Sequence, residues 1–265
     1  MRAAPLVFVV IAGCSAITLR QAQDEYNAGI AVIDTPSALP EAHFRKALEL
    51  LDEGALKGEG EPHERVAALV IDGYSSYGLY RLTGDDASYR RAQAAWERRA
   101  ESLAQVPESK RGVVRREAGL LAMLSPLLRA EHAMREYEKA ERVEDLVKRR
   151  SAHAKVFGSY ESILKQCLEV RDEVGVETTT APYLAIVTLD LCEGAAMAYS
   201  KSVNPAETAD AARDIGPVAA AAIQMLTWLK GSRRADADAI DRRTTTLKVR
   251  LKQIWPGVDT LGWPK

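Results

Sequence analysis

The side chains that could do chemistry are few and far apart in this sequence. The four histidines stand well separated, at His43, His63, His132 and His153. None of them follows a glutamate at the three-residue spacing of di-iron helix bundles, and no HExxH zinc motif occurs. His132 and Glu136 are one helical turn apart and could contact a metal together, although a solvated pair on a charged face is the more common arrangement. We therefore predict no catalytic residue, no metal site and no cofactor.

The amino-terminal stretch has the pattern of an export signal. The apolar run Leu6–Ala12 follows Arg2 and leads through small residues to Cys14. A membrane-spanning helix needs about 20 apolar residues, so this run is too short to cross a bilayer. A basic residue, a short apolar segment and a small-residue cleavage site are typical of a secretory signal peptide.

Residues 11–14, with the sequence IAGC, resemble the lipobox of bacterial lipoproteins. The resemblance implies that residues 1–13 are removed, that Cys14 carries a diacylglyceryl thioether, and that its new amine is acylated. Two or more acyl chains hold a protein on a membrane stably, whereas one does so only marginally. Ser15, in place of an aspartate, favours the outer membrane of a Gram-negative envelope, with the chain facing the periplasm. An ordinary secretory peptide, or a buried first helix that contains Cys14, is the alternative.

The composition favours an all-α chain with a substantial core. Hydrophobic residues make up 47% of the chain, which is enough to form a core, and the helix formers Ala, Leu, Glu and Arg are abundant. The 36 basic and 37 acidic side chains almost cancel, so no overall charge attracts the chain to nucleic acid. We expect residues 14–265 to form one domain that binds no nucleic acid.

Apolar side chains recur at helical spacing in the first part of the chain. One such set shares a face of a predicted helix: Phe44, Ala47, Leu48 and Leu51. Short stretches rich in Gly, Pro and Asp separate the periodic segments and act as turns. The pattern predicts helices over Leu19–Ile33, Glu41–Leu56, His63–Leu82 and from Asp86 onward.

The segment YSSYGLYRLTGDDASYRRAQAAW, residues 74–96, resembles a degenerate tetratricopeptide (TPR) unit. Gly78 lies in the first predicted helix, a Gly-Asp turn follows, and Ala92 precedes Trp96 by four residues in the second. The stretches YNAGIAV and EAHFRKALELL resemble a weaker copy. The resemblance implies TPR-like antiparallel helical hairpins over residues 14–107, in which small residues let paired helices approach closely.

An aromatic strip lies on the first helix of this unit. Tyr74, Tyr77 and Tyr80 recur at one-turn spacing, and Arg81 directly follows Tyr80. The first helix of a TPR unit lines a concave groove, and Tyr and Arg are frequent anchors at interfaces. We expect these four residues to bind a partner, with packing between hairpins as the alternative.

Residues 108–175 are expected to form a long charged helical segment. Between Arg129 and Arg150 most positions are charged, with both signs mixed, and the apolar residues form a thin seam. The seam residues recur at steps of three, four and seven between Met134 and Cys167. This pattern predicts one very long charged helix, or two collinear helices broken near Ser151–Gly158. The segment is either a projecting arm that meets a partner or a solvated helix that lies across the domain.

Residues 176–265 return to packed helices and end in a tail with two Trp-Pro steps. The most apolar helix is predicted to start near Ala181. A later helix starts near Asn204, and Gly216-Pro217 is expected to interrupt it. The tail, WPGVDTLGWPK, is either a clasp on the last helices or an exposed docking strip.

Two cysteines remain once Cys14 is lipidated. Cys167 and Cys192 could form a disulfide in an oxidising periplasm. Two separate buried thiols are the alternative, because a single pair shows no framework pattern.

Taken together, these patterns favour a lipid-anchored, non-enzymatic helical-repeat scaffold that binds another envelope protein. The segments ERVAALVIDGYSSYGLYRL and APYLAIVTLDLCEGAAMAYSKSVNPAE are similar to parts of the helical-repeat lipoprotein associated with tripartite ATP-independent periplasmic (TRAP) transporters. That resemblance implies an accessory lipoprotein that works beside a periplasmic solute-binding protein. A third hypothesis is an enzyme whose site is assembled from distant helices.

Overall fold

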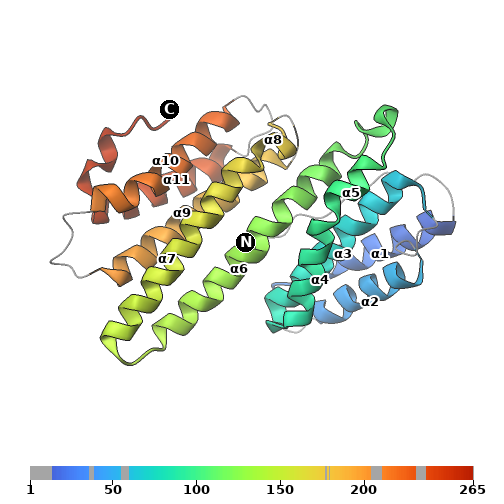
Figure 1. Ribbon diagram of the computed structural model, residues 1–265, viewed down its shortest axis with the longest axis horizontal. Helices are drawn as coiled ribbons and strands as arrows, with labels where there is room; N and C mark the ends of the chain where they lie inside the picture. Colours follow the sequence, from blue (N-terminus) through green and yellow to red (C-terminus); the bar gives the residue numbers. More distant parts are fainter. Residues whose placement is uncertain are drawn as a thin grey trace. The chain divides into compact units, whose positions relative to one another are not determined.

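The structure is a computed structural model, shown in Figure 1. It describes residues 14–35, 39–54, 60–176, 178, 180–203, 211–230 and 237–264. Every regular element in these residues is a helix, so the prediction of an all-α fold is confirmed. The chain divides into two compact units, Met1–Leu128 and Arg129–Lys265. The division falls inside helix α6 (Arg115–Glu141).

Unit 1 consists of consecutive helices that pack against their neighbours in the sequence. α1 packs on α2, α2 on α3 and α3 on α4, and α1 also contacts α3. Each helix expected in this part lies close to its predicted place, and the predicted apolar face of α2 is buried. The elements are α1 (Cys14–Val32), α2 (Pro40–Glu53), α3 (Pro62–Thr83), α4 (Asp86–Glu97), α5 (Arg99–Ala104), the 3-10 helix η2 (Glu108–Lys110) and the first part of α6.

Helix α3 is the centre of unit 1. Every residue from Val66 to Tyr80 is buried, and α1, α2, α4 and α5 all pack against the helix. The Tyr74 hydroxyl donates a hydrogen bond of 2.9 Å to the backbone oxygen of Leu120 in α6. α3 therefore presents almost no surface to solvent along this stretch.

The ring of Phe44 in α2 fits between two glycines on neighbouring helices. A Cβ atom added at Gly29 in α1 would lie 2.8 Å from a ring carbon of Phe44, and one added at Gly78 in α3 would lie 2.7 Å away. The Tyr26 ring packs against Phe44 with a centroid distance of 5.9 Å. Only residues without a side chain allow three helices to approach one aromatic ring this closely.

Helix α9 (Ala181–Ser202) is the centre of unit 2. The helices α7, α10 and α11 all pack against it. Among the described helices, α9 alone is long and apolar enough by composition to cross a membrane, and 67% of its apolar window is buried, as expected of a core helix. The other elements are α7 (Leu146–Glu169), α8 (Arg171–Val174), α10 (Ala211–Leu229), α11 (Ala237–Ile254) and the 3-10 helix η4 (Pro256–Thr260).

The charged middle segment forms a hairpin, which corrects the prediction of one long helix or two collinear helices. α6 ends at Glu141, and the Asp145 side chain caps the first turn of α7. Arg129 donates to Gln166 at 3.0 Å, and the Tyr137 ring lies 4.9 Å from the His153 ring. The second part of α6 and α7 therefore run antiparallel within unit 2.

The interruptions predicted at Ser151–Gly158 and at Gly216-Pro217 are both wrong. α7 runs through Gly158, where an added Cβ would meet nothing within 4 Å, because a helical glycine weakens a helix without ending it. α10 runs through Pro217 with Ile215 and Val218 fully buried. This packing outweighs the single backbone hydrogen bond that proline cannot make.

The Trp-Pro tail folds back on α11 as a clasp. Val258 in η4 is fully buried. The Trp263 indole donates a hydrogen bond of 3.0 Å to the backbone oxygen of Val258. The Lys248 ammonium of α11 lies 4.8 Å from the centre of the Trp263 ring, within range of a cation–π contact.

Candidate functional site

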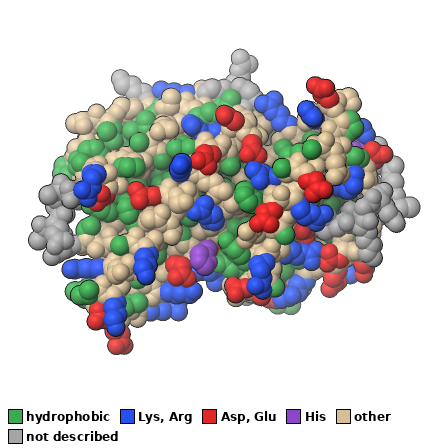
Figure 2. Space-filling model, in the orientation of Figure 1, with side chains coloured by type: hydrophobic (Ala, Val, Ile, Leu, Met, Phe, Trp, Pro, Cys, Tyr) green, Lys and Arg blue, Asp and Glu red, His purple; other side chains and the backbone are tan. Residues whose placement is uncertain are grey.

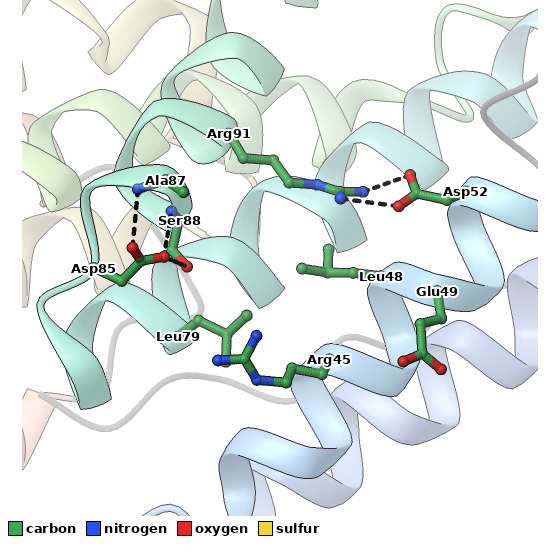
Figure 3. Close-up of a pocket in the computed structure, with 9 residues that line it drawn as sticks. All are labelled: Arg45, Leu48, Glu49, Asp52, Leu79, Asp85, Ala87, Ser88 and Arg91. Atoms are coloured by element: carbon green, nitrogen blue, oxygen red, sulfur yellow. Dashed lines mark hydrogen bonds and ion pairs between the residues drawn. The ribbon is translucent and has the colours of Figure 1, made fainter.

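Unit 1 carries a surface pocket between α2 and α4 (Figure 3). Its volume is about 290 Å³, which suits a small molecule or one side chain of a partner. The walls come from α2, from the α3–α4 turn and from the start of α4. The lining residues are Arg45, Leu48, Glu49, Asp52, Leu79, Asp85, Ala87, Ser88 and Arg91.

Arg91 joins the helices on which the pocket is built. Its guanidinium donates to the two oxygens of Asp52 at 2.7 and 3.0 Å, and its Nε donates to Asp72 at 2.6 Å. Asp72 is buried in α3; burial raises the pKa of its carboxyl, while the charge of Arg91 lowers it. A bidentate arginine–carboxylate pair fixes both partners in one geometry, so this wall is rigid.

The α3–α4 turn forms a second wall. Gly84 ends α3 with a left-handed φ of 72°, and its N–H donates to Tyr80 at 2.8 Å. Asp85 then caps α4 by accepting hydrogen bonds from the hydroxyl of Ser88 at 2.8 Å and from the N–H groups of Ser88 and Ala87. These hydrogen bonds, that of the Ser88 hydroxyl first, lower the pKa of Asp85. Its carboxylate is thus ionised and engaged in the cap.

Arg45 is the less constrained of the two arginines that line the pocket. It pairs with Glu41 at 2.7 Å, one turn earlier on α2, but 60% of the Arg45 side chain is exposed. Such surface pairs contribute little free energy, so the guanidinium can turn to a ligand. Figure 3 shows it reaching toward Leu79, which together with Leu48 forms an apolar and buried floor.

The lining supports recognition better than acid–base chemistry. Ser88 supplies the one hydroxyl among the nine described lining residues, and it donates to Asp85. No imidazole or thiol belongs to the same nine residues. What the pocket offers is an apolar floor, fixed carboxylates and an adaptable arginine.

The structure corrects the prediction that Tyr74, Tyr77 and Tyr80 bind a partner. Each tyrosine is at most 4% exposed. The Tyr80 ring packs edge-on against Tyr89 of α4 at 5.1 Å, and α6 accepts the hydrogen bond from Tyr74. Helical spacing places the three rings on one side of α3, but neighbouring helices cover that side. Arg81, next in sequence, is partly exposed at the end of the helix.

The predicted lipidation site lies at the edge of the described residues. Cys14 is the first residue of α1, but its side chain and residues 1–13 lie outside the part that the structure describes. Lipidation of Cys14 therefore stays a prediction.

The other two cysteines are free and buried in unit 2. Burial raises the pKa of Cys167 to about 12 and also raises that of Cys192, with Cys167 adding to the second shift. The Cys192 thiol donates to the backbone oxygen of Val218 at 3.4 Å. Both thiols are therefore protonated and unreactive at neutral pH.

The possible metal pair on α6 is a surface arrangement. His132 is exposed, and Glu136 accepts a hydrogen bond of 2.7 Å from Lys139, which lowers the pKa of the carboxyl. In the part of the chain that the structure describes, no group of three or more His, Cys, Asp or Glu side chains could hold a metal ion.

A polar cluster around the buried His153 in unit 2 was not predicted from the sequence. His153 is fully buried, its Nε2 lies 3.4 Å from Glu141 Oε1, and Lys201 Nζ lies 3.6 Å from the same oxygen. The sequence pattern that could have predicted its burial is the helical spacing of His153 with Val156 and Tyr160. This spacing places the histidine on the buried face of α7.

Comparisons with known proteins find nothing similar to this chain. No protein-family model matches it, and no curated protein and no solved structure matches it. The function must therefore be argued from the residues themselves.

Proposed function

We propose that this chain is a lipid-anchored, periplasm-facing, non-enzymatic helical scaffold that binds another protein of the bacterial envelope. The observation that carries the proposal is the pocket of Figure 3, with its apolar floor, its exposed Arg45 and walls braced by Arg91 and Asp85. Recognition sites combine apolar surface with a few fixed polar groups, and arginine is a frequent anchor there.

The order of helices in unit 1 supports the scaffold proposal. Consecutive helices pack pairwise from α1 to α4, and α1 also contacts α3, as the first helices of successive hairpins do in repeat proteins. A TPR-like arrangement over residues 14–107 would give the pocket a rigid base. Fold alone does not assign a function, so the pocket carries the argument.

The membrane anchor rests on the lipobox resemblance of residues 11–14. Cys14 is the first residue of α1, so acyl chains such as palmitate on this residue would tether unit 1 directly. Ser15 favours the outer membrane as the site of anchoring. Dual or triple acylation is what makes such an anchor stable.

A second candidate is an accessory lipoprotein of a TRAP-type solute transporter. The pocket volume of about 290 Å³ favours it, since this is close to the lower end of the range for small-molecule sites. In this case the natural partner is a periplasmic solute-binding protein.

Crosslinking and capture from native envelope membranes tests the proposal. The variants are Cys14→Ala, which removes the anchor, and Arg45→Glu, which reverses the exposed charge of the pocket. Arg90→Glu is the matched control, because Arg90 is exposed on α4 but does not line the pocket.

We expect one defined partner with the wild type and with Arg90→Glu, and its loss with Cys14→Ala and Arg45→Glu. A solute-binding protein as that partner would select the transport function. Equal capture by all four proteins, or no capture by any, would contradict the proposal.

A further inference from the structure

The tip of the α6–α7 hairpin exposes two adjacent aliphatic side chains. We use the name hairpin tip for residues 142–155, which comprise the turn and the first turns of α7. Leu146 is 55% exposed and Val147 is 76% exposed. Neighbouring aliphatic residues exposed to this extent at the end of a hairpin are a feature of surfaces that bind something apolar.

Basic side chains surround these two residues. The hairpin tip contains five Lys or Arg residues and two acidic residues, although the whole chain has a net charge of −1. Figure 2 shows Lys and Arg side chains beside hydrophobic atoms at this end of the hairpin, at the lower left, with acidic side chains among them. Arg142, Lys148, Arg150 and Lys155 make no ion pair within the described residues.

The two acidic residues of the tip neutralise only part of this charge. The Asp145 carboxylate accepts the hydrogen bond from the Lys148 N–H at 2.9 Å and so belongs to the helix cap. Glu144 contacts Arg149, the fifth basic residue, through its backbone oxygen. The unpaired cations therefore remain available to an anionic surface.

The tip is held in a fixed shape by the residues behind it. His153 and Val156 are buried on the inner side of α7, and the Tyr137 ring packs on His153 at 4.9 Å. Capping by Asp145 fixes the direction in which α7 starts. Leu146 and Val147 are thus presented on a firm turn, and binding does not need to order a loose loop.

We propose that the hairpin tip docks on an anionic lipid surface. Arg142, Lys148 and Lys155 contact phosphate headgroups, and Leu146 and Val147 enter the boundary between headgroups and acyl chains. Unpaired cations beside exposed aliphatic residues are the combination that binds membrane interfaces. The inference rests on the proposed function only in that the anchor on Cys14 brings the chain to a membrane.

Vesicle co-sedimentation tests this with the mature chain, residues 14–265, carrying Cys14→Ala, so that neither an acyl group nor the apolar run Leu6–Ala12 contributes. The vesicles are phosphatidylglycerol with phosphatidylethanolamine, and pure phosphatidylcholine as the neutral comparison. One variant changes Arg142, Lys148 and Lys155 to Gln, and a second changes Leu146 and Val147 to Ser. The matched controls change Arg20, Arg90 and Lys165 to Gln, and Val113 and Val249 to Ser; all five control positions are exposed.

We expect binding to anionic vesicles and not to neutral ones. Each lost cation should weaken the partition coefficient about fivefold, so the triple Gln variant falls well over tenfold, while its control keeps most of the binding. The double Ser variant should also bind several-fold more weakly than its control. A circular dichroism melt of each variant shows that it is folded.

Three outcomes would overturn the proposal: no binding to anionic vesicles, equal loss in variant and control, or full binding by the double Ser variant. Pure lipid and an unlipidated chain exclude both the anchor and any partner. A failure here therefore leaves the capture experiment, and the proposed function, untouched.

Discussion

The imidazole of His153 lies 3.4 Å from Glu141 Oε1, fully buried, with neither ring nitrogen in a hydrogen bond. The groups that face it are Glu141 and Tyr137 from α6, Lys201 from α9 and Arg149 from its own helix. Burial lowers the pKa of His153 below the ordinary value of 6.5; Glu141 opposes this, whereas Lys201 and Arg149 add to it. The folded protein thus holds a neutral histidine in its interior.

This arrangement predicts a loss of stability in mild acid. Below pH 6.5 the unfolded chain binds a proton at His153 that the folded chain does not yet bind, so the free energy of unfolding falls as the pH falls toward the lowered pKa. His153→Gln should flatten the pH dependence of urea unfolding between pH 7 and 5. His43→Gln, at a half-exposed histidine paired with Glu25, is the control and should change it less. Identical slopes for wild type and His153→Gln would refute this reading.

The Phe44 ring makes Gly78 intolerant of any side chain. Gly78→Ala places a methyl carbon 2.7 Å from a rigid ring and should lower the free energy of unfolding by about 2 kcal/mol. Gly158→Ala is the matched control, since nothing lies within 4 Å of the new methyl, and it should stabilise the protein by about 0.5 kcal/mol. Thermal denaturation measures both, and equal effects of the two substitutions would mean that the close approach to Phe44 is not constraining.

Removing Arg91 should be costly because it strands a buried carboxylate. Arg91→Ala leaves Asp72 without its partner and is expected to destabilise the protein by about 3 kcal/mol. Adding Asp72→Asn should recover a large part of that loss, since the buried charge is then gone. Arg45→Ala, at an exposed pair on the same pocket, should cost less than about 0.5 kcal/mol. Chemical denaturation of the wild type, the two single variants and the double variant measures these free energies of unfolding. Equal losses for Arg91→Ala and Arg45→Ala would mean that Arg91 does not hold the helices together.

Cys14 should be the site of acylation. The wild type is expected to incorporate an alkyne analogue of palmitate and to enter the detergent phase of a Triton X-114 separation. Cys14→Ala should not incorporate the analogue. Cys192→Ala should do both as the wild type does, because Cys192 is a fully buried thiol. Labelling that persists in Cys14→Ala would mean that the lipobox resemblance is misleading.

Local patterns were sufficient to predict the helices of unit 1 but not what surrounds them. The spacing of Phe44, Ala47, Leu48 and Leu51 predicts one buried face of α2, and the structure confirms it. The same reasoning fails for Tyr77 in α3, because this helix is covered from several sides and its burial is set by distant segments.

No local sequence pattern could have predicted the pocket. Asp52 and Arg91, which brace it, are 39 residues apart, and Asp72 comes from a third helix. The α6–α7 turn was not predicted: the expected break lay near Ser151–Gly158 in an otherwise straight segment, whereas the Asp145 cap and the packing of α7 on α9 place a turn before Leu146. The periodicity of one helix predicts which of its faces is buried, but it does not predict which distant segment contacts that face.

Site-specific photo-crosslinking in living cells tests the scaffold proposal most directly. Benzoylphenylalanine replaces Glu49, an exposed wall residue of the pocket, or Arg90, an exposed residue of α4 outside it. The proposal predicts a discrete crosslinked protein from position 49 and none from position 90, with the first lost when Cys14→Ala is added. No crosslink from position 49, or the same products from both positions, would contradict the claim that this pocket binds an envelope partner.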